Sequence, residues 1–100
     1  MLLHTVNKSP FERDAFKACL QHAKKGDSVL LIEDGIYAAL KDTAVAAQIQ
    51  QAMKNVTVYA LTPDLEARGM KERVLDGVKL VDYAGFVDLT VQCKAVQAWL

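Results

Sequence analysis

The stretch Ser28-Val29-Leu30-Leu31-Ile32 decides the fold of this 100-residue chain. Its last four residues are all apolar, and Glu33-Asp34-Gly35 ends the run. A strand with one wet face alternates apolar and polar residues, whereas a strand that is apolar throughout is typical of a parallel sheet covered by helices on both faces. The run therefore predicts an interior strand of an α/β fold.

Strands and helices are expected to alternate on either side of this run. Strands are predicted at residues 2–6, 56–61, 78–81 and, as an edge strand, 96–100; helices are predicted at 9–25, 43–54 and 83–93, with shorter helical segments at 36–40 and 62–68. Such alternation indicates a parallel sheet of about five strands with helices on both faces, and a flavodoxin-like strand order is its simplest topology. Residues 1–100 are expected to form a single domain.

The first helix has the clearest local signals. Ser9-Pro10-Phe11-Glu12 has the pattern of a capping box with proline in the first turn, which predicts that the helix starts there. Gly26 is expected to end the helix as its C′ residue. Between these signals, an apolar arc at helical spacing includes Phe16 and Cys19.

The composition argues against several classes of function. Twelve basic and twelve acidic side chains give no net charge and form no basic tract, so direct nucleic-acid binding is not expected. The chain has no phosphate-binding glycine motif, and neither a cofactor nor a metal site is predicted. Cys19 and Cys93 make no CxxC pair, which favours a reducing compartment. Without a signal-peptide pattern or a membrane-length apolar run, a cytoplasmic protein is expected.

Four carboxylates are expected at the carboxyl edge of the sheet. Asp34, Asp64 and Asp82 follow three predicted strands, and Glu33 lies beside them. One hypothesis is an acidic pocket for a metal or for acid–base chemistry, which would make the chain a small enzyme. The favoured interpretation is that these carboxylates cap helices and complement helix dipoles.

Cys19 is the residue best suited to sulfur chemistry. A sulfur carrier needs an accessible thiolate, and His22, three residues on, is the one plausible activator. Because Cys19 lies on the apolar arc in mid-helix, a buried structural role is the favoured interpretation. Burial is also favoured for Cys93, which shares a helix face with Phe86 and Leu89.

Two aromatic residues in predicted strands complete the set of candidates. His4 is expected to be structural, because it lies inside the first strand and has no metal-ligand spacing to a second histidine or a cysteine. Trp99 indicates that the last segment docks, either on this domain or on a partner. These residues alone indicate an α/β domain, expected to be oligomeric, with no strong catalytic motif.

The order of short motifs resembles the DsrH/TusB family of the DsrE/DsrF/DsrH sulfur-relay group. Residues 3–10 (LHTVNKSP) resemble the family's L-H-T-x-x-[KR]-S-P, residues 33–39 (EDGIYAA) its [EQ]-D-G-x-x-A-A, and residues 98–100 its terminal A-W-L. Residues 59–61, 64–69 and 81–90 are similar to later blocks of the family. Each block is weak by itself, but six in order along the chain are specific.

The resemblance implies a role within a larger assembly. Members of the group form a heterohexamer with DsrE/TusD-like and DsrF/TusC-like subunits, two copies of each, and pass persulfide sulfur to a DsrC/TusE-like carrier. The outcome is either 2-thiolation of the wobble uridine of tRNA or sulfur oxidation. The chain would then be a sulfurtransferase subunit that is not catalytic alone.

The resemblance also bears on the branch of the family. A cysteine in the first helix, here Cys19, is more typical of DsrH-like members, and it makes Cys19 the candidate persulfide carrier. The chain therefore resembles the DsrH-like branch more closely, which favours sulfur oxidation or a related relay, with tRNA thiolation as the alternative pathway. The alternative is a non-catalytic scaffold subunit.

Overall fold

The computed structural model describes all 100 residues, which build one five-stranded sheet. Its strands are β1 (Leu2–Val6), β2 (Ser28–Leu31), β3 (Thr57–Leu61), β4 (Lys79–Val81) and β5 (Ala95–Trp99). The strand order is β4-β3-β2-β1-β5, and all neighbours are parallel. The predicted α/β class with a parallel sheet is confirmed. The order differs from that of flavodoxin, because β2, β3 and β4 follow β1 in one direction and only β5 lies on its other side.

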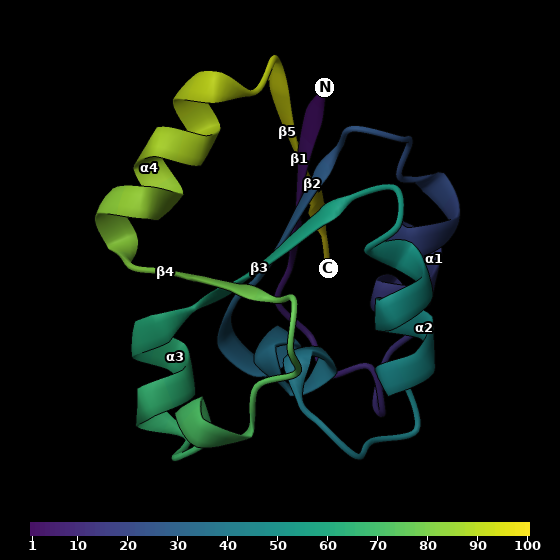
Figure 1. Cartoon of the computed structure of the whole chain (residues 1–100). Helices are drawn as coiled ribbons and strands as arrows, with labels where there is room; N and C mark the ends of the chain where they lie inside the picture. The colour runs from purple at the N-terminus through teal and green to yellow at the C-terminus, as the bar shows by residue number, and fades with distance from the viewer.

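Helical segments connect the strands and form a layer on each face of the sheet. They are α1 (Ala15–His22), the 3₁₀ segment η1 (Glu33–Ala39), α2 (Ala46–Ala52), α3 (Thr62–Ala67), the 3₁₀ segment η2 (Lys71–Arg73) and α4 (Tyr83–Gln92). Right-handed crossovers that proceed in one direction place their helices on one face, and a crossover that reverses direction places its helix on the other. Accordingly, α1 and α2 lie on one side of the sheet and α4 on the opposite side (Figure 1).

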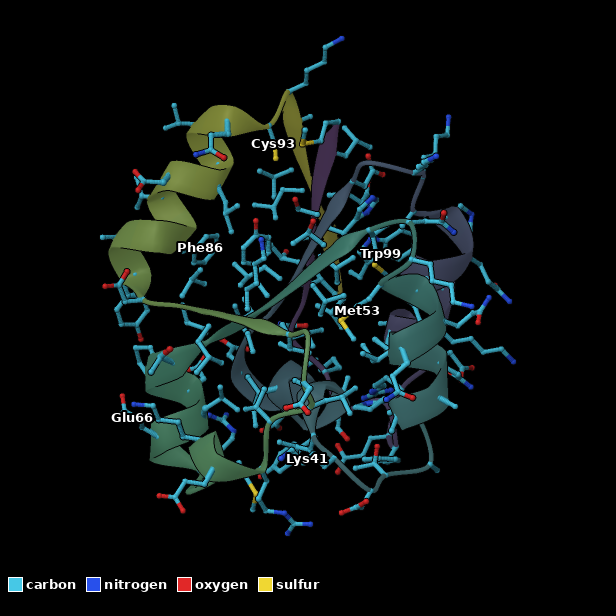
Figure 2. All side chains as sticks on the ribbon, viewed as in Figure 1. Lys41, Met53, Glu66, Phe86, Cys93 and Trp99 are labelled. Atoms are coloured by element: carbon cyan, nitrogen blue, oxygen red, sulfur yellow. The ribbon has the colours of Figure 1, made fainter.

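The two faces of the sheet have unequal cores. The face covered by α1, α2 and η1 has a cluster of 15 buried residues, which includes Phe16, Cys19, Ile36, Ile49 and Leu65. The opposite face has a cluster of four, Leu3, Leu30, Leu89 and Cys93, with Phe86 packed against it. Figure 2 shows Phe86 and Cys93 on α4 and the adjoining turn, between this helix and the sheet. A single helix therefore supplies all the helical cover of this second face.

The predicted start of the first helix is wrong. The side chain of Ser9 accepts a hydrogen bond from the N–H of Phe11 at 3.2 Å, and the Ser9 carbonyl closes a turn. This local turn competes with the helix, which begins only at Ala15. Phe11 is consequently 56% exposed. The helix also ends at His22, so Gly26, with φ +92°, is a turn residue and not its C′ residue.

Gly35 fixes the position of η1 against the end of β1. A Cβ atom at this position would overlap the Val6 carbonyl oxygen. That oxygen accepts a hydrogen bond from the N–H of Ile32 at 3.0 Å. The chain therefore turns tightly over the carboxyl edge of the sheet, and only glycine fits there.

Candidate functional site

Cys19 lies on the inner face of α1 and has no exposed surface. Its side chain belongs to the larger core cluster together with Phe16, the other buried residue of α1. Burial, followed by the negative charge of Asp27, raises the pKa of the Cys19 thiol to about 12. In this closed arrangement Cys19 is a protonated core residue, whereas a sulfur carrier needs an exposed thiolate.

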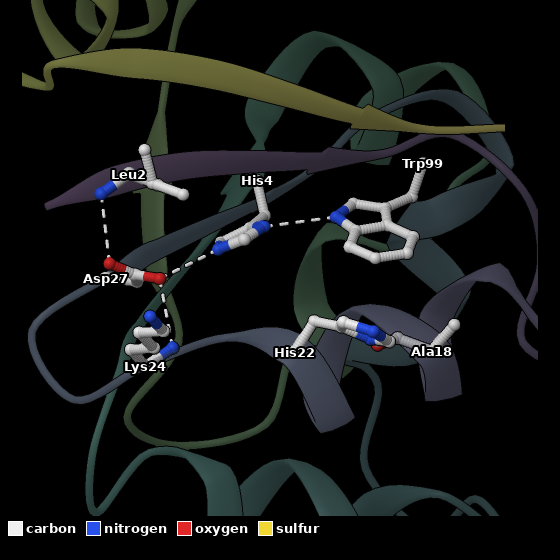
Figure 3. A network of polar contacts seen from close by, with 7 residues as sticks. All are labelled: Leu2, His4, Ala18, His22, Lys24, Asp27 and Trp99. Carbon is white, nitrogen blue, oxygen red and sulfur yellow. Dashed lines mark hydrogen bonds and ion pairs between the residues drawn. The ribbon is translucent and has the colours of Figure 1, made fainter.

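Asp27 is the centre of a buried polar network beside this core. It precedes β2, is 4% exposed, and its carboxylate accepts hydrogen bonds from the Leu2 N–H at 2.9 Å and the Lys24 N–H at 3.0 Å (Figure 3). Its second oxygen also contacts His4 Nε2 at 2.9 Å. Burial alone raises the pKa of Asp27, but these hydrogen bonds outweigh it and lower the pKa to about 2.

His4 connects Asp27 to Trp99. The indole Nε1–H of Trp99 donates to His4 Nδ1 at 3.0 Å. An indole N–H can only donate, so Nδ1 is the acceptor and the proton of the ring is on Nε2, which donates to Asp27. The network therefore joins β1, the turn before β2 and β5, and His4 is 2% exposed within it. Its structural role, expected from the sequence, is confirmed, and Trp99 docks on its own domain.

His22 is not placed to activate Cys19. Its Nδ1 donates to the Ala18 carbonyl oxygen at 2.9 Å, and its ring lies against Trp99 with the ring centroids 5.4 Å apart. His22 thus covers the outer side of the tryptophan (Figure 3). The pairing of Cys19 with His22 that the spacing suggests is not formed.

The carboxylates of the sheet edge are separated into two groups. Asp34 forms an ion pair with Arg68 at 3.0 Å, and Asp64 lies 4.0 Å from the same guanidinium. Asp64 also accepts a hydrogen bond from the Glu33 N–H at 2.6 Å. Asp82 is apart from them and caps α4, accepting from the Gly85 N–H at 2.8 Å. The capping and structural interpretation is confirmed for Asp82 and Asp64, and Arg68 is a member of the cluster that the sequence did not indicate.

Three further findings concern Cys93, metal-binding groups and membrane-spanning helices. Cys93 is 8% exposed and packs beside Leu89, as predicted. Nowhere in the structure do three or more histidine, cysteine or acidic side chains form a group suited to a metal ion. None of the helices combines the length and the apolar character that a bilayer crossing requires.

Similarity to known proteins identifies the family to which this chain belongs. A family model described as DsrH like protein matches residues 8–96. The chain belongs to the DsrH/TusB family. Protein TusB of Pectobacterium parmentieri and protein TusB of Escherichia coli K12 are each 38% identical to it over 98 residues, which is 98% of this chain and 100% of each relative. Family membership assigns the chain the general role of a sulfur-relay subunit with TusC- and TusD-like partners.

Solved structures agree on the fold. The ychN protein from E. coli has a TM-score of 0.82 at 17% identity, with 97% of each chain covered. A protein from Thermotoga maritima, determined by NMR in solution, has a TM-score of 0.65 at 28% identity, covering 92% of this chain and 93% of that one. The same fold thus occurs in chains whose sequences differ widely from this one.

Proposed function

We propose that this chain is a scaffold subunit of a cytoplasmic sulfur-relay complex. In this proposal residues 1–100 form one DsrH/TusB-like domain, which assembles with DsrE/TusD-like and DsrF/TusC-like subunits, two copies of each. The complex passes sulfur to a DsrC/TusE-like acceptor. The observation that carries the assembly role is an exposed apolar stripe on α4.

The α4 stripe consists of Tyr83, Val87 and Val91, which are 61%, 60% and 78% exposed. These residues are four apart, so they lie on one side of the helix, while Phe86 and Leu89 pack inward on the sheet. Val96 of β5, opposite Leu3 in the register, adds a further apolar side chain that is 48% exposed on the same face of the sheet. Apolar side chains gathered in this way mark a protein–protein interface.

The buried Cys19 supports the scaffold role over a carrier role. With no exposed surface and a pKa raised to about 12, its thiol cannot attack a donor persulfide in the closed structure. The principal sulfur chemistry would then belong to the DsrE/TusD-like partner, and this chain would hold the complex together.

The second candidate is that Cys19 itself carries sulfur after α1 moves away from the sheet. The Cys19 thiolate would attack the outer sulfur of a donor persulfide, form a new S–S bond and release the donor thiolate. Its position in the first helix, as in DsrH-like relatives, favours this candidate.

Persulfidation distinguishes the two candidates. We expect the assembled complex, treated with a low-molecular-weight persulfide, to leave Cys19 unmodified in intact-mass and peptide measurements, because the thiol is enclosed. Cys19→Ser and Cys93→Ser are the matched controls for assigning any added sulfur. One extra sulfur atom that appears in wild type and in Cys93→Ser but is lost in Cys19→Ser would establish the carrier and refute the pure scaffold.

The TusB relatives favour tRNA thiolation as the pathway. The test is complementation of an E. coli strain that lacks TusB, with 2-thiouridine at the tRNA wobble position measured by mass spectrometry. Restored thiolation is the expected result. If the chain forms the complex but leaves the tRNA unmodified, the result would contradict the tRNA role and support a role in sulfur oxidation.

A further inference from the structure

A groove runs between α1 and α2, on the face of the sheet opposite to α4. Its volume is about 530 Å³, and both helices contribute to its walls. The two helices lie side by side in Figure 1. Leu20 and Ala52 form apolar parts of the lining, while four amide side chains supply much of its polar surface: Gln21, Gln48, Gln51 and Asn55.

The groove lining contains one charged side chain, Lys17, and no carboxylate, while Asp14 lies beside Lys17 and Gln21 in an adjoining hollow. Residues 15–26 and 43–63 contain four lysines, Lys17, Lys24, Lys25 and Lys54, and no carboxylate. The rest of the chain holds eight basic and twelve acidic side chains. The helices α1 and α2, with the turns that follow them, therefore carry a positive local charge.

Two of these lysines, Lys25 and Lys54, lie near one end of the groove. The turn after α1 and the turn after α2 meet there, since the Gly26 N–H donates to the Asn55 carbonyl oxygen at 2.8 Å. Lys25 and Lys54 are the neighbours of these two residues in sequence. Lysines that follow helices also complement the helix dipoles, but this does not account for Lys17, which lies within α1 and lines the groove.

The lining suits a peptide backbone. An amide side chain both donates and accepts, so it can pair with the N–H and C=O groups of an extended segment. Single-stranded nucleic acid is recognised mainly by stacking on aromatic side chains, and the groove lining contains no aromatic residue. The combination of amides, small apolar residues and lysines favours an acidic peptide over RNA.

We propose that the α1–α2 groove binds an acidic peptide segment of a partner protein. The four amides bond the backbone of the segment, and the lysines at the end of the groove, together with Lys17, pair with its carboxylates. Because the groove and the α4 stripe lie on opposite faces of the sheet, this partner binds while α4 is covered by a sister subunit. The proposal concerns a different surface from the assembly role and does not depend on it.

The test uses the full chain and a fluorescent peptide of alternating glutamate and alanine. Fluorescence anisotropy gives its affinity, and a benzophenone group on the peptide, followed by mass spectrometry, gives the site of contact. We expect cross-links in α1 and α2, weaker binding at higher salt, and an affinity about tenfold lower for the double variant Lys17→Glu/Lys54→Glu. The matched control is Lys79→Glu/Lys94→Glu, which changes the net charge equally but lies outside the groove, and its affinity should be nearly unchanged.

Three outcomes would overturn the proposal. The first is binding of a lysine–alanine peptide as tight as that of the glutamate–alanine peptide, or no binding of either. The second is an equal loss of affinity in both double variants, which would indicate attraction by net charge alone. The third is displacement of the peptide by oligouridine at lower concentration, which would assign the groove to RNA.

Discussion

Asp27 shows how one side chain can hold several segments of a chain together. It accepts hydrogen bonds from the backbone of Leu2 and Lys24 and from the ring of His4, and His4 in turn accepts from Trp99. A buried carboxylate without partners would be costly, whereas one with a full set of donors is stabilised in its charged form. The charge of Asp27 is therefore part of what stabilises the sheet.

The depressed pKa of Asp27 predicts a loss of stability in acid. The folded-state pKa is about 2, below the ordinary 3.8, so the stabilisation is complete above pH 4 and disappears as the pH falls towards 2. Its size is about 2 kcal/mol. We expect Asp27→Asn to lower the free energy of unfolding near pH 6 by about this amount and to differ little from wild type near pH 2.

Urea unfolding across this pH range measures the effect. Asp88→Asn, which removes an exposed carboxylate of α4, is the control and should follow the wild-type curve. A constant difference between Asp27→Asn and wild type at every pH would mean that Asp27 acts through packing and not through its charge.

Single residues were predictable only where their role is local. The burial of Cys93 and the structural role of His4 follow from the faces of a helix and a strand. The His4–Asp27 and His4–Trp99 pairs span 23 and 95 residues, and no spacing rule relates residues that only the sheet brings together. Asp27 was missed because a carboxylate between a glycine and a serine has the pattern of a solvated turn.

At the scale of elements, η1 is held in place by two specific contacts. It crosses the carboxyl edge of the sheet with Gly35 pressed against the Val6 carbonyl group. It also lies next to the Asp34–Arg68 ion pair, which joins it to α3. The Asp34-Gly35 pair of the family motif thus has a physical basis: the glycine allows the close approach and the aspartate anchors the segment.

Gly35→Ala is expected to destabilise the fold severely. The new methyl group meets backbone that cannot rotate away, so the free energy of unfolding should fall by about 3 kcal/mol. Gly69→Ala is the matched control, because Gly69 has φ +66° but open space around it, and its cost should be about 1 kcal/mol. Thermal unfolding of both variants provides the comparison, and equal losses would contradict the close-approach argument.

The strands were predicted better than the helices, for a physical reason. All five strands lie within one or two residues of their expected bounds, because continuous apolar runs between turn residues are uncommon elsewhere. The first two long helices are shorter than expected, at Ala15–His22 and Ala46–Ala52. Helix propensity and capping residues contribute little free energy. Tertiary contacts can therefore favour a competing turn, such as the one at Ser9, over the first turns of a helix.

For the whole molecule, the decisive feature is the direction of the last crossover. The chain moves from β1 through β4 in one direction and then returns to place β5 beside β1. This reversal puts α4 alone on one face and leaves its outer stripe uncovered. The alternation of strands and helices predicted the class of fold but not this reversal, because every order of parallel strands gives the same alternation along the chain.

The exposed α4 stripe predicts that a substitution there disrupts assembly without lowering the stability of the fold. Val91 is 78% exposed, so Val91→Glu should change the free energy of unfolding by no more than about 0.5 kcal/mol. It should nevertheless abolish co-purification with the TusC- and TusD-like subunits, because a charge would be buried in the interface. Gln92→Glu, one residue on and also exposed, is the matched control and should assemble normally. If light scattering shows intact complexes that contain Val91→Glu, α4 is not part of the interface.

The pairing of β5 with β1 has a consequence for synthesis of the protein. β5 is the last of the five strands to leave the ribosome, yet it pairs with the first one made, and Trp99 supplies the only indole donor to His4. Until then the β1 edge is open and His4 has only Asp27 as a side-chain partner, a state that invites wrong pairing of β1 with other chains. Translation that stops before β5 therefore yields a nascent chain whose β1 edge is unpaired and open to aggregation.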